Sequence, residues 1–331
     1  MRLRLACVMG FALAALALLA AFAAPIEVAD VWRLVEEDRV DVNHYPGRIW
    51  FLGEDRMLFS NERSRTTEIW EIGGGDGPER IAGAGVVFAV SGDGLFFAAA
   101  DGSGAVSIWS AGSLAKTSDL CMLESTPYPR GAFSPDGRIL AVGNRRDDIE
   151  LWDIATSERL AVLEGLDSNL FGVVFSSDGS FLAVAGGWSG GTSEDSSRIM
   201  IWDAETFELV ADLPTIDIGD NHAIVLAQDD TRLYSGGTGP LVGWDTGSWE
   251  RVYEAGAAYV GNSGLAVSPS EPILASAYHS GALRLIDLRS MRTIRDIVIP
   301  GNRPLGVGFS PNGSRLAASF DGRMIVVWRA P

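Results

Sequence analysis

The chain has 331 residues, of which 47% are hydrophobic, and this is enough to build a sizeable core in one or two domains. Its formal net charge is −17, so it lacks the basic footprint that binding to nucleic-acid phosphates requires. A disulfide framework is excluded because Cys121 is the only cysteine besides Cys7, which lies in the apolar N-terminal run.

The first 23 residues have the layout of a secretory signal peptide. Arg2 and Arg4 form a short positive region, Leu5 to Ala23 carries no charge, and Ala21-Phe22-Ala23 is a small-x-small cleavage site. We therefore expect a signal peptide over residues 1–23 and an exported mature chain, periplasmic or extracellular. The alternative is an uncleaved membrane anchor over residues 5–23, because this run is nearly long enough to span a bilayer. No other part of the chain is expected to contact a membrane.

A repeat of about 42 residues follows. Its most regular feature is a short apolar run that usually ends in Trp-Asp, with one anchor residue in each of seven units. Successive anchors are separated by 39, 43, 50, 42, 42 and 42 residues, a spacing that no helical or coiled-coil period explains. The seven anchors are Trp70, Trp109, Trp152, Trp202, Trp244, Ile286 and Trp328.

A hairpin signal keeps step with these anchors. Phe133-Ser-Pro-Asp-Gly137 recurs as Phe175-Ser-Ser-Asp-Gly179 and as Phe309-Ser-Pro-Asn-Gly313, each time between two apolar strands. Asp-Gly and Asn-Gly favour such turns because these residues accept positive φ, so we read the acids as turn residues and not as ligands. Each unit then predicts four short strands, which in unit three are Gly131–Ser134, Ile139–Gly143, Ile149–Asp153 and Arg159–Leu163. Regular short strands at this period predict an all-β propeller.

The pairing of Ser-Pro-Asp-Gly with a later Leu-Trp-Asp resembles the WD-repeat propellers, and the resemblance covers most of residues 30–331. It implies one seven-bladed β-propeller domain with four-stranded blades. The seventh unit stops after its third strand, while Asp30–Asp38 forms a spare strand before unit one. We expect this strand to complete the last blade and close the ring, since closure removes sheet edges that otherwise template aggregation.

The histidine content departs from the family, and one glycine-rich segment resembles a phosphate-binding loop in its sequence alone. The histidine that the family often places before the first strand is absent from most units, because His44, His222 and His279 are the only ones, and we expect the blades to depend more on apolar packing. The same three histidines and two cysteines give no metal-binding spacing, so we expect neither a metal nor a cofactor. Gly73-Gly-Gly-Asp-Gly77 lacks the Lys-Ser/Thr tail of a phosphate-binding loop and is expected to be a connection between strands.

The resemblance also implies which loops share a face. Loops between the second and third strands lie with the connections between blades, and we call this side the upper face. We predict a partner-binding arc there, with Trp188 of a long loop at its margin; the predicted residues are Arg63, Arg65, Tyr128, Arg130, Arg145, Arg146, Trp188 and Arg303. An acidic arc would lie beside it, carrying Asp167, Glu194, Asp195, Asp217 and Asp220. Alternatively, these charges only solvate the loops.

We interpret the chain as a noncatalytic scaffold or sensor outside the cytoplasm. As a monomeric propeller, it is expected to bind other proteins through its loop face. One alternative is a small-ligand-binding or hydrolytic propeller that uses its central channel. Its expected signal is polar inner strands, whereas Val87–Val90, Val173–Phe175 and Val307–Phe309 are mostly apolar. A further alternative is an envelope assembly factor. The fold by itself does not choose between these functions.

Overall fold

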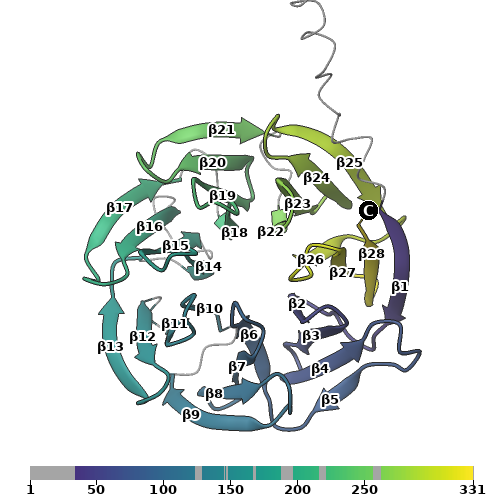
Figure 1. Cartoon of the computed structure of the whole chain (residues 1–331), viewed down its shortest axis with the longest axis horizontal. Helices are drawn as coiled ribbons and strands as arrows, with labels where there is room; N and C mark the ends of the chain where they lie inside the picture. The colour runs from purple at the N-terminus through teal and green to yellow at the C-terminus, as the bar shows by residue number, and fades with distance from the viewer. Residues whose placement is uncertain are drawn as a thin grey trace, which may run out of the picture.

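The computed structural model describes residues 34–123, 129–144, 146, 148–166, 169–187, 197–215, 221–255 and 262–330. These residues form seven four-stranded antiparallel sheets arranged as blades around a centre, as Figure 1 shows. The first strand of each blade lies nearest the centre and the fourth lies at the rim. The prediction of an all-β propeller with seven blades is therefore confirmed. No helix long and apolar enough to cross a bilayer occurs within these ranges.

The first three blades each take four consecutive strands. Blade 1 contains β2 (Ile49–Leu52), β3 (Arg56–Asn61), β4 (Thr66–Glu71) and β5 (Glu79–Ile81). Blade 2 contains β6 (Val86–Val90), β7 (Phe96–Ala100), β8 (Ala105–Ser110) and β9 (Lys116–Met122). Blade 3 contains β10 (Gly131–Phe133), β11 (Ile139–Gly143), β12 (Ile149–Asp153) and β13 (Glu158–Leu163), within one residue of the predicted bounds.

The next three blades repeat this order. Blade 4 contains β14 (Asn169–Phe175), β15 (Phe181–Gly187), β16 (Arg198–Asp203) and β17 (Leu209–Pro214). Blade 5 contains β18 (Asn221–Leu226), β19 (Arg232–Gly237), β20 (Leu241–Asp245) and β21 (Arg251–Ala255). Blade 6 contains β22 (Asn262–Val267), β23 (Ile273–Tyr278), β24 (Ala282–Asp287) and β25 (Arg292–Val298).

Blade 7 is built from both ends of the propeller. It contains β26 (Pro304–Phe309), β27 (Arg315–Phe320) and β28 (Met324–Arg329), and its fourth strand is β1 (Val35–Asp41). β1 pairs with β28 in antiparallel register, with Val35 opposite Arg329 and Asp41 opposite Met324. This agrees with the predicted closure, although the strand runs three residues past Asp38, the expected end. Residues 30–33 of the predicted strand lie outside the described ranges.

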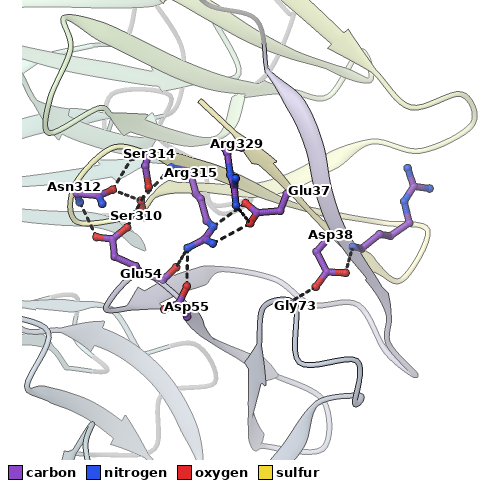
Figure 2. A network of polar contacts seen from close by, with 11 residues as sticks. Glu37, Asp38, Glu54, Asp55, Gly73, Ser310, Asn312, Ser314, Arg315 and Arg329 are labelled. Atoms are coloured by element: carbon purple, nitrogen blue, oxygen red, sulfur yellow. Dashed lines mark hydrogen bonds and ion pairs between the residues drawn. The ribbon is translucent and has the colours of Figure 1, made fainter. Parts of the chain in front are cut away.

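A network of charges fastens this closing strand (Figure 2). The Glu37 carboxylate accepts hydrogen bonds from Arg315 Nε and Nη2 at 2.8 and 2.9 Å, and from Arg329 Nη2 at 2.6 Å. Arg315 Nη1 also donates to the Asp55 carboxylate at 2.8 Å, so one guanidinium joins β1 to blade 1. The hydrogen bonds from Arg315, and then those from Arg329, lower the pKa of Glu37 from 4.5 to about 2.

Backbone groups complete the fastening on both sides of this network. Glu54 Oε1 accepts a hydrogen bond from the Asn312 backbone N–H at 2.9 Å, which ties blade 1 to the first turn of blade 7. Asp38 Oδ2 accepts one from the Gly73 N–H at 2.6 Å. Gly73 adopts a φ of +78°, which favours glycine. The glycine-rich segment from Gly73 is thus a connection between strands, as expected, and it also holds β1.

The core is divided into clusters that lie between neighbouring blades. The cluster between blades 1 and 2, for example, contains Leu58, Phe97 and Trp109, all buried. The cluster between blades 7 and 1 contains Met57, Phe59 and Trp70 beside Val327 of β28. All seven predicted anchors lie on the third strands of their blades. Because each blade buries its faces only against its neighbours, a closed ring is needed to cover every face.

Side-chain hydrogen bonds close the recurring turn between the first and second strands of a blade. In blade 3, Ser134 Oγ donates to Asp136 Oδ1 at 2.7 Å, and the same carboxylate oxygen accepts the Arg138 N–H at 3.1 Å. Gly137 follows with a φ of +70°. The hydrogen bond from Ser134 lowers the pKa of Asp136, consistent with a carboxylate used for the turn. This agrees with its interpretation as a turn residue.

Candidate functional site: the upper face and the channel mouth

Antiparallel pairing fixes which loops share a face. Each inner strand runs from the upper face to the lower one, so the turn to the second strand lies on the lower face. The loop between the second and third strands, and the connection from each rim strand to the next blade, then both lie on the upper face. The described loops that carry the predicted arginines are 62–65, 129–130, 146 and 299–303, and all belong to the upper face.

Three of the predicted contact residues are exposed there. Arg63 and Arg146 project from loops whose backbone N–H groups are held by asparagines: Asn61 Oδ1 accepts from Arg63 at 3.1 Å, and Asn144 Oδ1 from Arg146 at 2.8 Å. Arg303 is held by its own ion pair, because Asp321 accepts from its backbone N–H at 2.7 Å and from Nε at 2.8 Å. These three side chains are available to a partner and differ in how firmly they are oriented.

Arg65 and Arg130 have a second role that the sequence did not indicate. Both are partly buried. Arg65 Nη1 donates to the Asp101 carbonyl at 3.0 Å and so joins blade 1 to blade 2. Arg130 Nη1 donates to the Pro129 carbonyl at 3.1 Å and lies 3.9 Å from Glu62 Oε1, which joins blade 3 to blade 1. These arginines therefore support the loops and offer less surface than a free side chain does.

Other predicted positions lie outside the described residues. They are Tyr128, Arg145 and Trp188 of the binding arc, and Asp167, Glu194, Asp195, Asp217 and Asp220 of the acidic arc. The membership of these residues in a binding surface stays a prediction.

The structure adds an aromatic residue to this face. Tyr45 lies in the connection from β1 to β2 and is 59% exposed. The Arg323 guanidinium carbon lies 5.6 Å from the centre of its ring, a cation–π geometry. Arg323 comes from the loop between β27 and β28, so the pair bridges two segments that are far apart in sequence. Nothing in the local sequence pairs these two residues, because the closure of blade 7 brings them together.

Arg48 is the most informative residue that the sequence reasoning missed. It precedes β2 of blade 1, and its Nη2 donates to the Phe171 carbonyl of blade 4 at 2.6 Å. β2 and β14 lie on different sides of the centre (Figure 1). The hydrogen bond from Arg48 to Phe171 therefore links blades 1 and 4 across the channel. A sequence signal did exist: Arg48, Arg130 and Arg303 each stand immediately before an inner strand. Aligning the units at these strands would have paired the three positions.

Electrostatics at the channel mouth disfavour the charge of Arg48. Burial, and then the neighbouring positive charge of Arg130, lower the pKa of Arg48 from 12.5 to about 9, although Glu62 acts in the opposite direction. Arg48 still carries its charge at pH 7.

The channel below Arg48 contains a cavity of about 160 Å³. Its wall combines apolar side chains with glycine backbone, and it is formed by Arg48, Ile49, Trp50, Gly172, Val173, Ala223, Ile224, Ser263, Gly264, Leu265, Gly306 and Val307. The apolar inner strands expected from the sequence are therefore present. Polar groups of the wall include Arg48, which precedes β2, and Ser263 of β22.

Bulges shape the upper end of this channel. The pairing register of β14 with β15 shifts between Leu170 and Gly172, so Phe171 is an extra residue in the strand, and its carbonyl accepts the hydrogen bond from Arg48. Similar shifts occur in β18, β22 and β26. A Cβ added to Gly306 would lie 2.7 Å from the Gly47 carbonyl oxygen, so this glycine lets blade 7 approach blade 1 closely.

Groups that support catalysis in other proteins have structural roles here. Ser263 Oγ donates to the Pro304 carbonyl at 2.8 Å, and burial raises the pKa of the Cys121 thiol to about 12. No group of three or more His, Cys, Asp or Glu side chains that could hold a metal ion occurs within the described ranges.

Comparison with known proteins finds sequence similarity over parts of the chain and structural similarity over nearly all of it. No family model matches it. It is 26% identical over 117 residues to Pre-mRNA-processing factor 19 homolog 2 of Arabidopsis thaliana, a match that covers 34% of this chain and 21% of that protein. It is 25% identical over 201 residues to Apoptotic protease-activating factor 1 of Mus musculus, covering 59% of this chain and 15% of that protein.

Two further similarities agree with this result. The chain is 32% identical over 82 residues to WD repeat-containing protein VIP3 of Arabidopsis thaliana, covering 25% of this chain and 23% of that protein. A chain in the crystal structure of the mitotic checkpoint complex superposes with a TM-score of 0.75 at 20% identity, covering 93% of this chain and 94% of that one. The three sequence matches each span less than a quarter of the relative's own length. Motifs, ring and similarities together support a seven-bladed propeller of the WD-repeat type.

Proposed function

We propose that the chain is a noncatalytic protein-interaction scaffold that binds its partners through the upper face of the propeller. The observation that carries this proposal is the set of exposed side chains Arg63, Arg146, Arg303 and Tyr45 on one side of a closed ring. Arginine and tyrosine are the residue types that dominate interface energies, together with tryptophan. A rigid ring with variable loops suits this role, because the loops can specialise while the blades stay unchanged.

Pre-organisation strengthens the proposal. Arg303 is fixed by a bidentate contact with Asp321, and Tyr45 is held against Arg323. A side chain that is already oriented loses less conformational freedom when a partner binds, which would otherwise cost about 0.5–1.5 kcal/mol for each rotamer-rich side chain. These two places are therefore the best candidates for anchoring contacts.

The charge of the face indicates the partner's chemistry. Its described exposed arginines favour a partner that presents carboxylates, although the whole chain carries a net charge of −17. Local complementarity would raise the association rate more than the affinity, and it would weaken as salt is added. Nucleic acid is not an expected partner of so acidic a protein.

We place this function outside the cytoplasm. The support is the N-terminal sequence alone: Arg2 and Arg4, then the uncharged run from Leu5 to Ala23 with its cleavage site. Residues 1–33 lie outside the described ranges. An anchor over residues 5–23 would leave the same propeller facing the same compartment.

The similarities support a role in protein assemblies. A propeller of this shape occurs in a chain of the mitotic checkpoint complex, and two curated relatives are named as factors in pre-mRNA processing and apoptotic protease activation. The low identities and partial coverage carry over the scaffold role as a proposal, without those partners.

Affinity capture from a native envelope extract tests the proposal. The bait would be compared with an upper-face variant, Arg63→Glu with Arg146→Glu and Arg303→Glu, and with a matched lower-face variant, Arg138→Glu with Arg289→Glu and Arg292→Glu. We expect a protein retained by the wild type and the lower-face variant and lost by the upper-face variant. A protein retained equally by all three folded baits contradicts the proposed face.

A further inference from the structure

We infer that a groove between blades 2 and 3 binds a lysine or arginine side chain that a partner protein presents at the upper face. The inference rests on the proposed scaffold function and specifies the chemistry of one contact. The groove has a volume of about 440 Å³, within the roughly 300–1,000 Å³ that ligand pockets measure. It is lined by Met122 of blade 2 and by side chains of β12, β13 and the loops next to them in blade 3, so it opens at the upper face.

Two carboxylates face each other at the upper end of this groove. β12 pairs with β13 so that Ile149 lies opposite Leu163. The same register, continued by one residue, places Asp148 opposite Glu164, and both of these residues line the groove. Directly opposite side chains on one face of a sheet have Cβ atoms about 5 Å apart, and like charges in such a pair are destabilising. A cation between the two carboxylates would remove this cost, so the pair points to a positively charged ligand.

The arginines of the groove leave these two carboxylates available. Neither Asp148 nor Glu164 forms an ion pair within the described part of the chain. Arg159 Nη1 lies 3.5 Å from Glu150 Oε1, so this guanidinium is paired lower in the groove. Arg146 is exposed at the upper end. The three carboxylates of the groove thus outnumber its two guanidinium groups, and the balance favours a basic ligand.

The buried carboxylate of Glu150 is not a requirement of the fold. Glu150 is 9% exposed, and it accepts hydrogen bonds from Trp152 Nε1 at 3.0 Å and from Asn144 Nδ2 at 3.2 Å. The residues two positions before the anchors of blades 4, 5 and 7 are all buried and apolar: Met200, Val242 and Val326. Burying a carboxylate costs free energy that an apolar residue at this position does not cost. We therefore attribute Glu150 to the groove, where it engages Arg159.

Apolar surface beside the carboxylates suits the stem of a basic side chain. Met122, at the end of β9, is 65% exposed, and Val162 lies opposite Glu150 on β13. All seven anchors lie within the described ranges, and Trp152, which lines the groove, is the only one that is not buried. Lysine and arginine pack their methylene stems on such surface while the charged head reaches polar partners. The groove therefore complements both parts of a basic side chain.

Other ligands fit these observations less well. A calcium ion takes six to eight oxygen ligands, and no group of three or more His, Cys, Asp or Glu side chains that could hold a metal occurs in the described part of the chain. An anion would be repelled by the carboxylates of Asp148 and Glu164. A purely apolar side chain would leave the like charges of this pair facing each other.

NMR of the full chain with isotope-labelled methionine methyl groups tests the inference. The basic probes are Nα-acetyl-arginine methylamide and Nα-acetyl-lysine methylamide, titrated separately at constant ionic strength, and neutral Nα-acetyl-citrulline methylamide is the control ligand. The Met122 methyl signal, assigned by its absence from Met122→Leu, reports binding because this side chain lines the groove. We expect a saturable shift of that signal with at least one basic probe and none with the citrulline derivative.

Variants of the groove should change this binding in opposite directions. Glu164→Gln and Asp148→Asn should each weaken it about three-fold, and together about ten-fold. Arg146→Gln, which removes a positive charge from the same groove, should strengthen it. Glu205→Gln, which changes an exposed acid of blade 4, is the matched control and should leave it unchanged. Because the two facing carboxylates repel each other, Glu164→Gln should unfold at a urea midpoint no lower than that of Glu205→Gln.

Three results of the titration would overturn the inference: no saturable shift with either basic probe, an equal shift with the citrulline derivative, or binding that Asp148→Asn with Glu164→Gln leaves unchanged. A clearly lower urea midpoint for Glu164→Gln would contradict the like-charge argument on which the groove depends. A failed titration with a positive envelope capture would remove the groove and leave the scaffold proposal intact. A positive titration with no captured protein would support the basic-group site and count against the scaffold proposal.

Discussion

Removal of the charge of Glu37 should loosen the closure of the ring. Glu37 of β1 receives three hydrogen bonds from Arg315 and Arg329, and Arg315 also reaches Asp55 of blade 1 (Figure 2). Glu37→Gln keeps the size of the side chain and removes its charge. Both arginines then lose their main acceptor, and the free energy of unfolding should fall.

The size of the effect follows from the pKa of Glu37. The difference between its ordinary pKa of 4.5 and the pKa of about 2 in the folded chain corresponds to roughly 3.4 kcal/mol at neutral pH. That value is an upper bound, because the side chains of Arg329 and Asp55 are 64% and 68% exposed and water screens their charges. We expect Glu37→Gln to lower the free energy of unfolding by about 1–2 kcal/mol at pH 7.

The pH dependence gives the effect a signature. The pKa of Glu37 is lower in the folded chain than in the unfolded one, so its stabilisation is complete above about pH 5 and is lost as the pH falls from about 4.5 to about 2. Urea unfolding followed by tryptophan fluorescence would measure wild type and Glu37→Gln across this range. The difference between them should shrink toward zero as the pH falls.

Glu36→Gln is the matched control, because Glu36 lies on the same strand and pairs only with the exposed side chain of Arg39 at 2.9 Å among the described residues. It should change the free energy of unfolding by less than about 0.5 kcal/mol. Equal effects of the two variants, or a Glu37→Gln effect that persists unchanged at pH 2, would refute the role of this network in closure.

Three further predictions concern packing and reactivity. Gly306→Ala places a Cβ 2.7 Å from the Gly47 carbonyl oxygen, so urea unfolding should show a loss of about 1–3 kcal/mol, and an unchanged midpoint would contradict the close approach of blades 7 and 1. Leu182→Ala opens a cavity between blades 3 and 4, where Leu182 is 1% exposed, and should cost about 2–5 kcal/mol in the same assay, against less than about 0.5 kcal/mol for an exposed substitution such as Arg63→Gln. Burial raises the pKa of the Cys121 thiol to about 12, so iodoacetamide at pH 8 should alkylate it far more slowly in the folded chain than in urea. The extent of alkylation would be measured on the tryptic peptide that contains Cys121, and equal rates would show that the thiol is not protected.

Features that depend on neighbours in sequence were predictable. The Ser-Pro-Asp-Gly turn of blade 3 is closed by Ser134 and Asp136 within a few residues, so its letters predict its geometry. The period of the anchors predicted the number of blades, and the missing fourth strand of the last unit predicted β1 as its replacement. Local turn chemistry and repetition thus determine most of this fold.

Contacts across the ring were not predictable in the same way. Arg48 reaches a carbonyl 123 positions away, and Tyr45 meets Arg323 only because β1 closes blade 7. Glu37 meets Arg315 for the same reason. Such contacts depend on how far each side chain extends once the blades are placed, and the motif letters do not contain that information. The described loops that carry the predicted arginines lie on the upper face, but the division between exposed and supporting side chains required the structure.

Photo-cross-linking from matched positions on the two faces tests the central claim most directly. Benzoylphenylalanine would replace either Tyr45 on the upper face, 59% exposed, or Leu95 in a lower-face turn, 58% exposed. After irradiation in a native envelope extract, the account predicts a discrete protein adduct from position 45 and none from position 95. The same adduct from position 95, or adducts from both positions alike, would contradict binding through the upper face.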